Sequence, residues 1–199
     1  MIGKGQSKIE DSVINFYKGV SINMKIKKLK KTAFAGKRFV VCYQTNGFYD
    51  ILKTENGFCI QYVPFESIAE RSFEDEFFSE WLDKPVAYGA FEDENLLGFV
   101  EGAKEAWNNR FRISNICVFD NATRHRGIGT ALLNVILSEA EKTGARMVVL
   151  ETQSCNENAI AFYRKNGFEI IGFDLYAYSN NDPECHEIRI EMGKKLEKN

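Results

Sequence analysis

A short run of arginine and glycine residues has the composition of an anion-binding site. The run, Arg-His-Arg-Gly-Ile-Gly at residues 124–129, follows an apolar strand-like stretch and opens a helix-like stretch at residues 130–141. The first turn of a helix leaves N–H groups unpaired and carries the positive end of the helix dipole, so it attracts phosphate. Glycine lets the backbone approach an anion closely, and the two arginines add positive charge. The pattern predicts a phosphate-binding turn here, with an ordinary basic turn before a helix as the alternative.

Two commoner glycine-rich motifs do not fit this run. A nucleoside-triphosphate P-loop needs a lysine directly after its last glycine, and none follows Gly129. A dinucleotide-binding fingerprint needs a third glycine three residues after the second, where this chain has Leu132. The sequence therefore points to a phosphate-containing ligand of another class.

A second motif lies further along the chain. Asn-x-x-Ala-x-x-Phe-Tyr at residues 156–163 precedes Lys-Asn-Gly-Phe at residues 165–168. In this order the two motifs resemble the coenzyme A pyrophosphate loop and the following helix and turn of the GNAT superfamily of N-acetyltransferases, over residues 85–193. The resemblance implies the GNAT fold, a mixed α/β (α+β) domain with a mostly antiparallel central sheet and helices on both faces. It also implies acetyl-CoA as the cofactor.

The resemblance assigns cofactor contacts to three stretches of the chain. In the family, the strand that matches residues 110–119 diverges from its parallel neighbour, and its backbone binds the pantetheine arm as an added strand would. A backbone N–H there also polarises the thioester carbonyl, as in an oxyanion hole. The implied cofactor residues are Ile116, Cys117, Val118, Arg124, His125, Arg126, Gly127, Ile128, Gly129, Thr130, Asn156, Ala159 and Tyr163.

Tyr163 is the general acid that we expect. A phenol with a pKa of about 10 can protonate a departing thiolate whose thiol has a pKa of about 8.5 without large tuning. The competing interpretation is a tyrosine packed on the buried side of its helix. The implied reaction is direct attack of a neutral amine on the thioester, and it needs no covalent acyl-enzyme.

The candidates for the general base and the acceptor site are single residues outside the two motifs. Glu101 lies on a predicted hairpin of residues 86–91 and 96–103, where a carboxylate among small and apolar neighbours can accept a proton or anchor an amine. Ser114, which could relay the proton through a water, is the other catalytic candidate. The candidate substrate-binding residues are Glu101, Trp107, Asp174 and Tyr176.

Within the superfamily, the chain resembles the streptothricin acetyltransferase group most closely. The resemblance rests on Trp107-Asn108 and on residues 150–153 and 178–180. Members of that group acetylate an amine on the β-lysine part of a cationic antibiotic. Relatives often carry acidic residues where this chain has Ser114-Asn115, so the base and the charge anchor of the substrate must lie elsewhere or act differently.

Three functions remain open from the sequence. The leading hypothesis is acetylation of a small cationic amine, with antibiotic resistance as a consequence. The second is acetylation of a protein or peptide amine. The third is a non-catalytic module that senses acetyl-CoA, which would bind the cofactor without releasing free CoA in response to an acceptor.

Composition limits the partners, the metal content and the cell compartment that we expect for this protein. A net charge of −2 gives no reason to expect a nucleic-acid partner, and no apolar run approaches the roughly 20 residues of a membrane helix. The five cysteines are odd in number and lack metal-site spacing, and with two histidines they predict a cytoplasmic protein with reduced thiols and no metal. A homodimer is compatible with the sequence.

The remaining pattern describes one domain, residues 24–199, after an extension of uncertain role at residues 1–23; Met24 is an alternative start. Residues 24–38 are basic, which predicts a solvated face with nucleic-acid binding as a minor alternative. Residues 38–43 and 57–63 read as strands with turns at Asn46-Gly47 and Asn56-Gly57. Residues 65–82 read as an amphipathic helix, whose acidic side either faces solvent or attracts a cationic substrate.

Towards the carboxyl end, the pattern alternates between helix and strand. Helices are predicted at residues 127–141 and 156–164, on either side of a buried parallel strand at residues 146–152. Two antiparallel strands at residues 168–178 and 187–192 follow, joined by a polar loop at residues 179–186.

Overall fold

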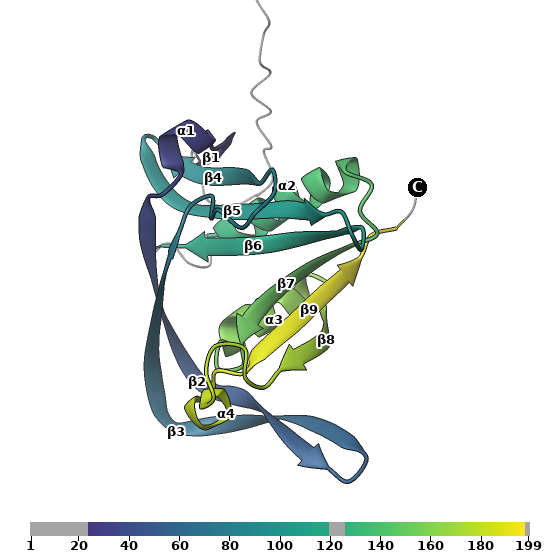
Figure 1. The fold of residues 1–199 in the computed structure, drawn as a ribbon. Helices are drawn as coiled ribbons and strands as arrows, with labels where there is room; N and C mark the ends of the chain where they lie inside the picture. The colour runs from purple at the N-terminus through teal and green to yellow at the C-terminus, as the bar shows by residue number, and fades with distance from the viewer. Residues whose placement is uncertain (1–23, 120–125, 198–199) are drawn as a thin grey trace, which may run out of the picture.

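The computed structural model describes residues 24–119 and 126–197 (Figure 1). Strands dominate, and the two longer helices both lie in the second half of the chain. The elements are β1 (Met24–Lys28), α1 (Lys31–Phe34), β2 (Arg38–Thr54), β3 (Gly57–Glu76), β4 (Val86–Glu92), β5 (Asn95–Glu105), β6 (Arg110–Val118), α2 (Ile128–Lys142), β7 (Met147–Gln153), α3 (Glu157–Lys165), β8 (Glu169–Asp174), α4 (Asp182–Cys185) and β9 (Arg189–Lys195). In this part of the chain no helix combines the length and the apolar composition needed to cross a membrane.

A seven-stranded sheet in the order β1-β4-β5-β6-β7-β9-β8 forms the centre of the domain. Its neighbouring strands are antiparallel except for the pair β6 and β7. The predicted fold class, mixed and mostly antiparallel, is confirmed. The predicted hairpin of residues 86–103 and the antiparallel pairing at the carboxyl end are confirmed as well.

The helices α2 and α3 pack on one face of this sheet. Leu132 and Ile136 of α2 and Ile160 of α3 are fully buried against Phe111 and Leu150 of the sheet, in the larger of two apolar clusters. Helix α2 was predicted from the recurrence of apolar residues at helical spacing and α3 from the resemblance of its motif to the family's helix, and both are confirmed within one residue at each end. Residues near the start of β2 and the end of β3 pack in the smaller apolar cluster on the other face, whereas Ile51 of β2 belongs to the same cluster as the helices.

The prediction of a helix at residues 65–82 is wrong, because these residues continue strand β3 as far as Glu76. The strand pairs with β2 over nearly its whole length, from Thr54 opposite Gly57 to Arg38 opposite Glu76. Glutamate favours helices only by a fraction of a kcal/mol per residue, and the many cross-strand bonds outweigh it. The turn at Asn56-Gly57 is confirmed. Asn46-Gly47 forms a shift of register inside β2 instead of a turn.

The β2–β3 ribbon, called the arm below, links the two halves of the domain. At one end Phe39 and Phe77 pack against Phe99 of β5 with ring centroids 4.9 and 4.3 Å apart. Near the middle of the ribbon, Glu157 of α3 accepts hydrogen bonds from the Tyr62 hydroxyl at 2.6 Å and from the backbone N–H of Asn46 at 2.7 Å. The arm therefore spans the sheet from β5 to α3 (Figure 1).

Strands β6 and β7 diverge after a short stretch of pairing. Their paired residues end at Arg112 opposite Val149, although β6 continues to Val118 and β7 to Gln153 (Figure 1). The divergence that the family resemblance implied is present. It leaves one edge of β6 without a strand partner from Ile113 onwards, within the described residues.

A β-bulge lies at the point of divergence. Glu101 of β5 pairs with Asn115, whereas Gly102 pairs with Ile113, so Ser114 is the extra residue. Bulges redirect side chains and are common beside active sites. Here Ile113 points into the larger apolar cluster, while Cys117 belongs to the smaller one on the other face.

The carboxyl-terminal segment differs in detail from its prediction. Strand β8 ends at Asp174 rather than at residue 178, and the predicted polar loop contains the short helix α4. The carboxylate of Asp182, which is 1% exposed, accepts hydrogen bonds from the Tyr178 backbone N–H at 2.8 Å and from the Ser179 hydroxyl at 2.6 Å. These bonds turn the chain before β9 and prevent a longer strand.

Candidate functional site

The start of α2 has the geometry of an anion-binding turn. Gly127 is the N-cap residue, with a left-handed φ of 80°, and as a glycine it has no side chain to cap the helix. The first-turn N–H groups are therefore not used by a side chain of the N-cap residue. Ile128 is buried in the core, whereas Gly129 and Thr130 are half-buried. Glycine at the N-cap adopts this φ without the steric cost that a Cβ adds.

The predicted arginine cluster is only partly described. Arg124 and His125 lie outside the described residues. The guanidinium of Arg126 forms an ion pair with Glu92 of β4, with Nη2 and Oε1 2.6 Å apart. Arg126 is thus held beside the start of α2, where an incoming phosphate would compete with Glu92 for it.

The two sequence motifs meet at Gly129. A Cβ added to Gly129 would lie 3.5 Å from Cζ of Phe162 on α3 and 4.0 Å from Cγ2 of Val118 on β6. The start of α2, the end of β6 beyond its pairing with β7 and the middle of α3 therefore lie around one small region. Ile116 and Val118 of β6 are half-buried there against the larger apolar cluster.

Helix α3 presents two of the predicted cofactor residues to this region and uses a third for its own cap. The side-chain oxygen of Asn156 accepts the backbone N–H of Ala159 at 3.2 Å, so Asn156 caps the helix. Ala159 is half-buried against the larger cluster. The capping role was not predicted, although asparagine before a helix is a common sign of it.

Tyr163 is buried and also faces β6. Its ring packs between Phe162 and Phe168, with centroids 5.5 and 5.9 Å away. Burial, and to a lesser extent the nearby thiol of Cys117, raises the pKa of the Tyr163 phenol. The phenol therefore remains protonated throughout the physiological range and can act as a donor.

Glu101 and Ser114 form a hydrogen-bonded pair at the bulge. The Ser114 hydroxyl donates to Oε1 of Glu101 at 3.2 Å, and the backbone N–H of Phe78 donates to Oε2 at 2.7 Å. The side chain of Glu101 is 0% exposed. Burial raises the pKa of Glu101, and the negative charge of Asp75 adds to the rise. The two hydrogen bonds and Lys31 oppose it. A carboxylate with a raised pKa accepts a proton more readily than an ordinary glutamate.

Asp75 and Asn115 lie beside the Glu101–Ser114 pair, and the sequence did not predict them as site residues. Nδ2 of Asn115, the residue after the bulge, donates to Oδ2 of Asp75 at 3.0 Å. Asp75 comes from the arm, in the segment that was predicted as a helix. The alternation of Phe73, Asp75 and Phe77 at the two-residue period of a strand was the available signal for its inward direction.

The remaining predicted substrate residues lie away from Glu101. Trp107 is 83% exposed in the turn between β5 and β6, at the opposite end of β6 from the divergence, with the Arg110 guanidinium 5.9 Å from its ring. Asp174 ends β8 and pairs with Arg189 at 3.4 Å, and it also accepts the Tyr176 backbone N–H at 3.1 Å. In the sheet, β7 and β9 separate β8 from β6. The structure does not bring these three residues together with Glu101 and Ser114.

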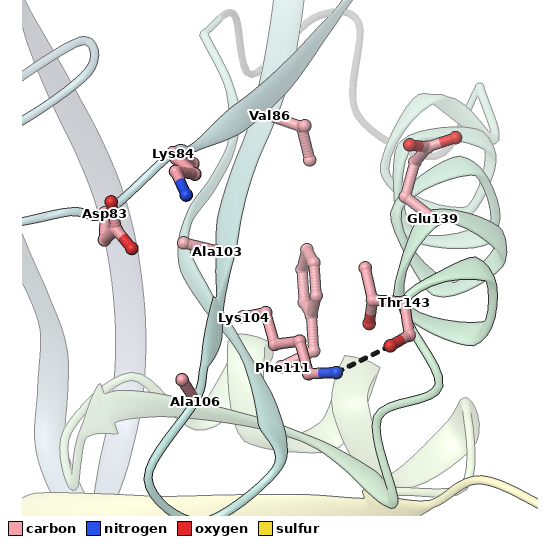
Figure 2. Close-up of a pocket in the computed structure, with 9 residues that line it drawn as sticks. All are labelled: Asp83, Lys84, Val86, Ala103, Lys104, Ala106, Phe111, Glu139 and Thr143. Carbon is pink, nitrogen blue, oxygen red and sulfur yellow. Dashed lines mark hydrogen bonds between the residues drawn. The ribbon is translucent and has the colours of Figure 1, made fainter.

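A cavity of about 310 Å³ lies elsewhere, between the end of β5 and the end of α2 (Figure 2). Phe111 and Val86 form apolar parts of its wall, and charges of both signs surround it. The ammonium of Lys104 donates to the backbone carbonyl of Thr143 at 2.6 Å (Figure 2). None of the predicted site residues lines this cavity, so it is separate from the site at the divergence.

Comparison with known proteins identifies the family of this chain. Residues 47–168 match the model of the Acetyltransferase (GNAT) family. A streptothricin acetyltransferase from Streptomyces lavendulae is 30% identical over 152 residues, which cover 71% of this chain and 79% of that protein.

Two solved structures share the fold over most of the chain. The crystal structure of nourseothricin acetyltransferase has a TM-score of 0.70 at 24% identity and covers 87% of this chain and 99% of its own. A Bacillus anthracis str. Ames protein assigned to the streptothricin acetyltransferases, solved in complex with acetyl coenzyme A, has a TM-score of 0.64 at 25% identity and covers 89% and 100%. With the matched family model and the diverging β6 and β7, these similarities show that the chain belongs to the GNAT family of acetyltransferases.

Proposed function

We propose that this protein transfers the acetyl group of acetyl-CoA to a primary amine of a small cationic molecule of the streptothricin type. The observation that supports this most is the opening between β6 and β7, which has Tyr163 on one side and the Glu101–Ser114 pair at the bulge. An acid and a base on the two sides of one opening suit a reaction in which an amine loses a proton and a thiolate gains one.

The residues present fit the cofactor. The first turn of α2, which begins at Gly127, and the Arg126 guanidinium would hold its diphosphate, and the edge of β6 that faces the divergence, at Ile116, Cys117 and Val118, would hold its pantetheine arm. Asn156 and Ala159 belong to the cap and first turn of α3, the helix whose Phe162 lies near Gly129. Acetyl-CoA supplies an activated acyl group, and the residues of the chain orient it and move the protons.

The proton route on the acceptor side follows from the hydrogen bonds at the bulge. A proton leaving the acceptor nitrogen passes to Oγ of Ser114 while the hydroxyl proton of Ser114 passes to Oε1 of Glu101, 3.2 Å away. Glu101 ends the step protonated, and its buried site favours that neutral form. On the other side of the opening, the Tyr163 hydroxyl would protonate the departing sulfur.

Gly129→Ala tests the cofactor side. The added Cβ would make only ordinary contacts, 3.5 Å from Phe162, so we expect the variant to fold with an unchanged melting temperature. The same methyl group obstructs the close approach of a diphosphate to the helix N-terminus, which should raise the KM for acetyl-CoA roughly tenfold, or about 1.4 kcal/mol.

Steady-state kinetics at saturating acceptor measure this effect. Gly172→Ala on β8 is the matched control, because its Cβ would also meet only ordinary contacts, at 3.7 Å from Glu191. Equal KM values for acetyl-CoA in the two variants would contradict the placement of the diphosphate at α2.

The proposed function itself is tested by the release of free CoA from acetyl-CoA in the presence of different amines. The panel contains streptothricin, a small aliphatic diamine without an antibiotic scaffold, and a peptide with a free amino terminus. We expect the highest kcat/KM with streptothricin. Preference for the peptide would favour the protein N-acetyltransferase alternative, and cofactor binding without release for any amine would favour the sensor.

We further propose that residues 24–199 act as one acetyltransferase domain and that residues 1–23 are an extension to it. The odd and scattered cysteines support a reducing, cytoplasmic setting. The slightly acidic balance of the chain supports small-molecule acceptors over nucleic acid. Truncation before Met24 should leave kcat/KM for acetyl-CoA and acceptor within twofold of the full chain, since this domain carries both groups of site residues. A large loss on truncation would show that residues 1–23 complete the site.

A further inference from the structure

We propose that Asp75, which the arm brings to β6, is the residue that binds the ammonium group of the acceptor. The arm would then be part of the acceptor site and not only a brace across the sheet. This inference rests on the proposed function and specifies how that site captures its substrate. It also supplies the charge anchor that β6 lacks, because β6 carries Ser114 and Asn115 at the bulge.

Two hydrogen bonds fix the Asp75 carboxylate beside the bulge. Oδ2 accepts from Nδ2 of Asn115 at 3.0 Å, and Oδ1 accepts from the backbone N–H of Glu76 at 2.8 Å. Asn115 is 9% exposed and directly follows Ser114 in the chain, so its amide has little freedom to move. A carboxylate oxygen has two lone pairs, and each of these oxygens therefore keeps one for a further donor.

Asp75 is more accessible to an incoming cation than Glu101 is. Glu101 is completely buried beneath Phe78 and Ser114, whereas Asp75 is only half-buried. A substrate ammonium could not approach Glu101 without displacing those contacts, but it could reach Asp75 directly. The two carboxylates thus have separate tasks, with Asp75 binding the charged amine and Glu101 taking its proton through Ser114.

The two groups that donate hydrogen bonds to Asp75, the Asn115 amide and the Glu76 N–H, are neutral and leave its charge in place. In the described part of the chain the ion pairs do not include Asp75, although its neighbour Glu74 is paired with Arg38 at 2.6 Å. A half-buried carboxylate without a cation has lost part of its hydration, and an ammonium ion restores favourable interactions there. The site therefore favours acceptors that arrive positively charged.

Asp75 also acts on the base. Its negative charge contributes to the raised pKa of Glu101, and Lys31 of α1 is the charged group that acts in the opposite direction. The other groups that face the Glu101 carboxylate are the Phe78 N–H and the Ser114 hydroxyl. Removing the charge of Asp75 should therefore lower the pKa of Glu101.

Asp75→Asn is the decisive variant. Its side-chain oxygen can still accept the Asn115 amide, so the arm keeps its attachment while the charge is lost. We expect the KM for a cationic amine to rise roughly tenfold, because one charge–charge contact is lost, while kcat stays within about threefold. The KM for acetyl-CoA should be unchanged. The acid limb of the kcat profile should move to lower pH than in the parent protein.

Glu74→Gln is the matched control, since it removes the same charge from the adjacent residue, which is exposed and faces the other way. It should leave the KM for the amine, kcat, the KM for acetyl-CoA and the acid limb of the kcat profile unchanged. Asp75→Glu, which retains the charge, should recover part of the acceptor affinity. Melting temperatures and calorimetric binding of the acceptor to the CoA-bound protein separate binding from folding.

The outcomes distinguish the two levels of the proposal. If the parent protein releases no CoA with any amine, the proposed function fails. If the parent protein is active but Asp75→Asn and Glu74→Gln have the same KM for the acceptor, the role of Asp75 is wrong. A lower melting temperature in Asp75→Asn together with an unmoved acid limb and an unchanged calorimetric affinity would also overturn it, and would assign Asp75 to attachment of the arm.

Discussion

Replacing Glu101 with glutamine is expected to lower kcat by about 10³-fold, within the range of general-base effects. Glutamine keeps a side-chain oxygen that can accept the Phe78 N–H, so the local hydrogen bonding survives. It cannot accept the proton that Ser114 passes on. The acid limb of the parent kcat profile, which should lie above the ordinary glutamate pKa of about 4.3, should disappear in the variant.

Glu101→Gln should lower kcat, but it should not lower the folding stability. Burial raises the pKa of Glu101 in the folded state, so the ionised side chain disfavours folding. In the parent protein the stability contribution of this group is fully present below the unfolded-state pKa and is lost as pH rises through the folded-state pKa. Glutamine does not titrate. We therefore expect Glu101→Gln to be at least as stable as the parent protein at neutral pH, as measured by thermal unfolding.

Glu105→Gln is the control for this prediction. Glu105 lies on the same strand but accepts hydrogen bonds from Arg110 at 3.1 Å and Arg112 at 2.6 Å. Burial disfavours its charge, but the bonds from Arg112 and Asn108 outweigh burial and lower the pKa of Glu105. Its stabilising effect is thus present above the unfolded-state pKa and lost as pH falls. The control should lose stability at neutral pH and keep its kcat. A normal kcat in Glu101→Gln would exclude Glu101 as the base.

Tyr163→Phe should lower kcat by about 10²-fold and leave the affinity for acetyl-CoA nearly intact. The aromatic ring keeps its place between Phe162 and Phe168, so only the hydroxyl is lost. Because burial raises the pKa of Tyr163, the parent enzyme should show no loss of activity from this group up to about pH 10, its ordinary pKa. Turnover and acetyl-CoA binding are the two measurements required.

A change of leaving group sharpens this test. An acetyl thioester of a more acidic thiol needs less protonation as it departs, so the deficit of Tyr163→Phe should shrink with such a substrate. Tyr88→Phe serves as the control, because Tyr88 interacts with Glu139 on α2 rather than with the opening. Unchanged turnover in Tyr163→Phe would favour the interpretation of Tyr163 as a packed core residue.

Local patterns were sufficient for the parts of the fold that depend on near neighbours in the chain. Helix α2 could be predicted because its apolar residues recur at helical spacing, α3 because its motif resembles the family's helix, and the glycine-containing turn before α2 because it has a distinctive composition. Because Tyr163 lies on α3, the prediction of that helix was enough to place it on a helix beside the motif. The family, and with it the divergence of β6 and β7, could be predicted from the same two motifs.

The arm could not be predicted in this way. Residues 65–76 carry several glutamates and aromatic residues at spacings that fit a helix, yet residues 69–76 pair with residues 38–45 of β2. The many cross-strand bonds are formed with residues far away in the chain, so a local window does not contain them. The position of Asp75 beside Asn115 has the same origin, since it depends on how the arm packs on β5 and β6.

Thus the sequence by itself determined the family, the helices α2 and α3 and the residue types of the proposed acid and base, because these depend on short-range spacing and on side-chain chemistry. Only the tertiary structure decided which carboxylates meet. The bulge at Ser114 redirects β6, burial excludes water from Glu101, and the arm delivers Asp75 to the same edge. Each of these depends on strand register, which is set by the packing of the whole domain rather than by any one segment.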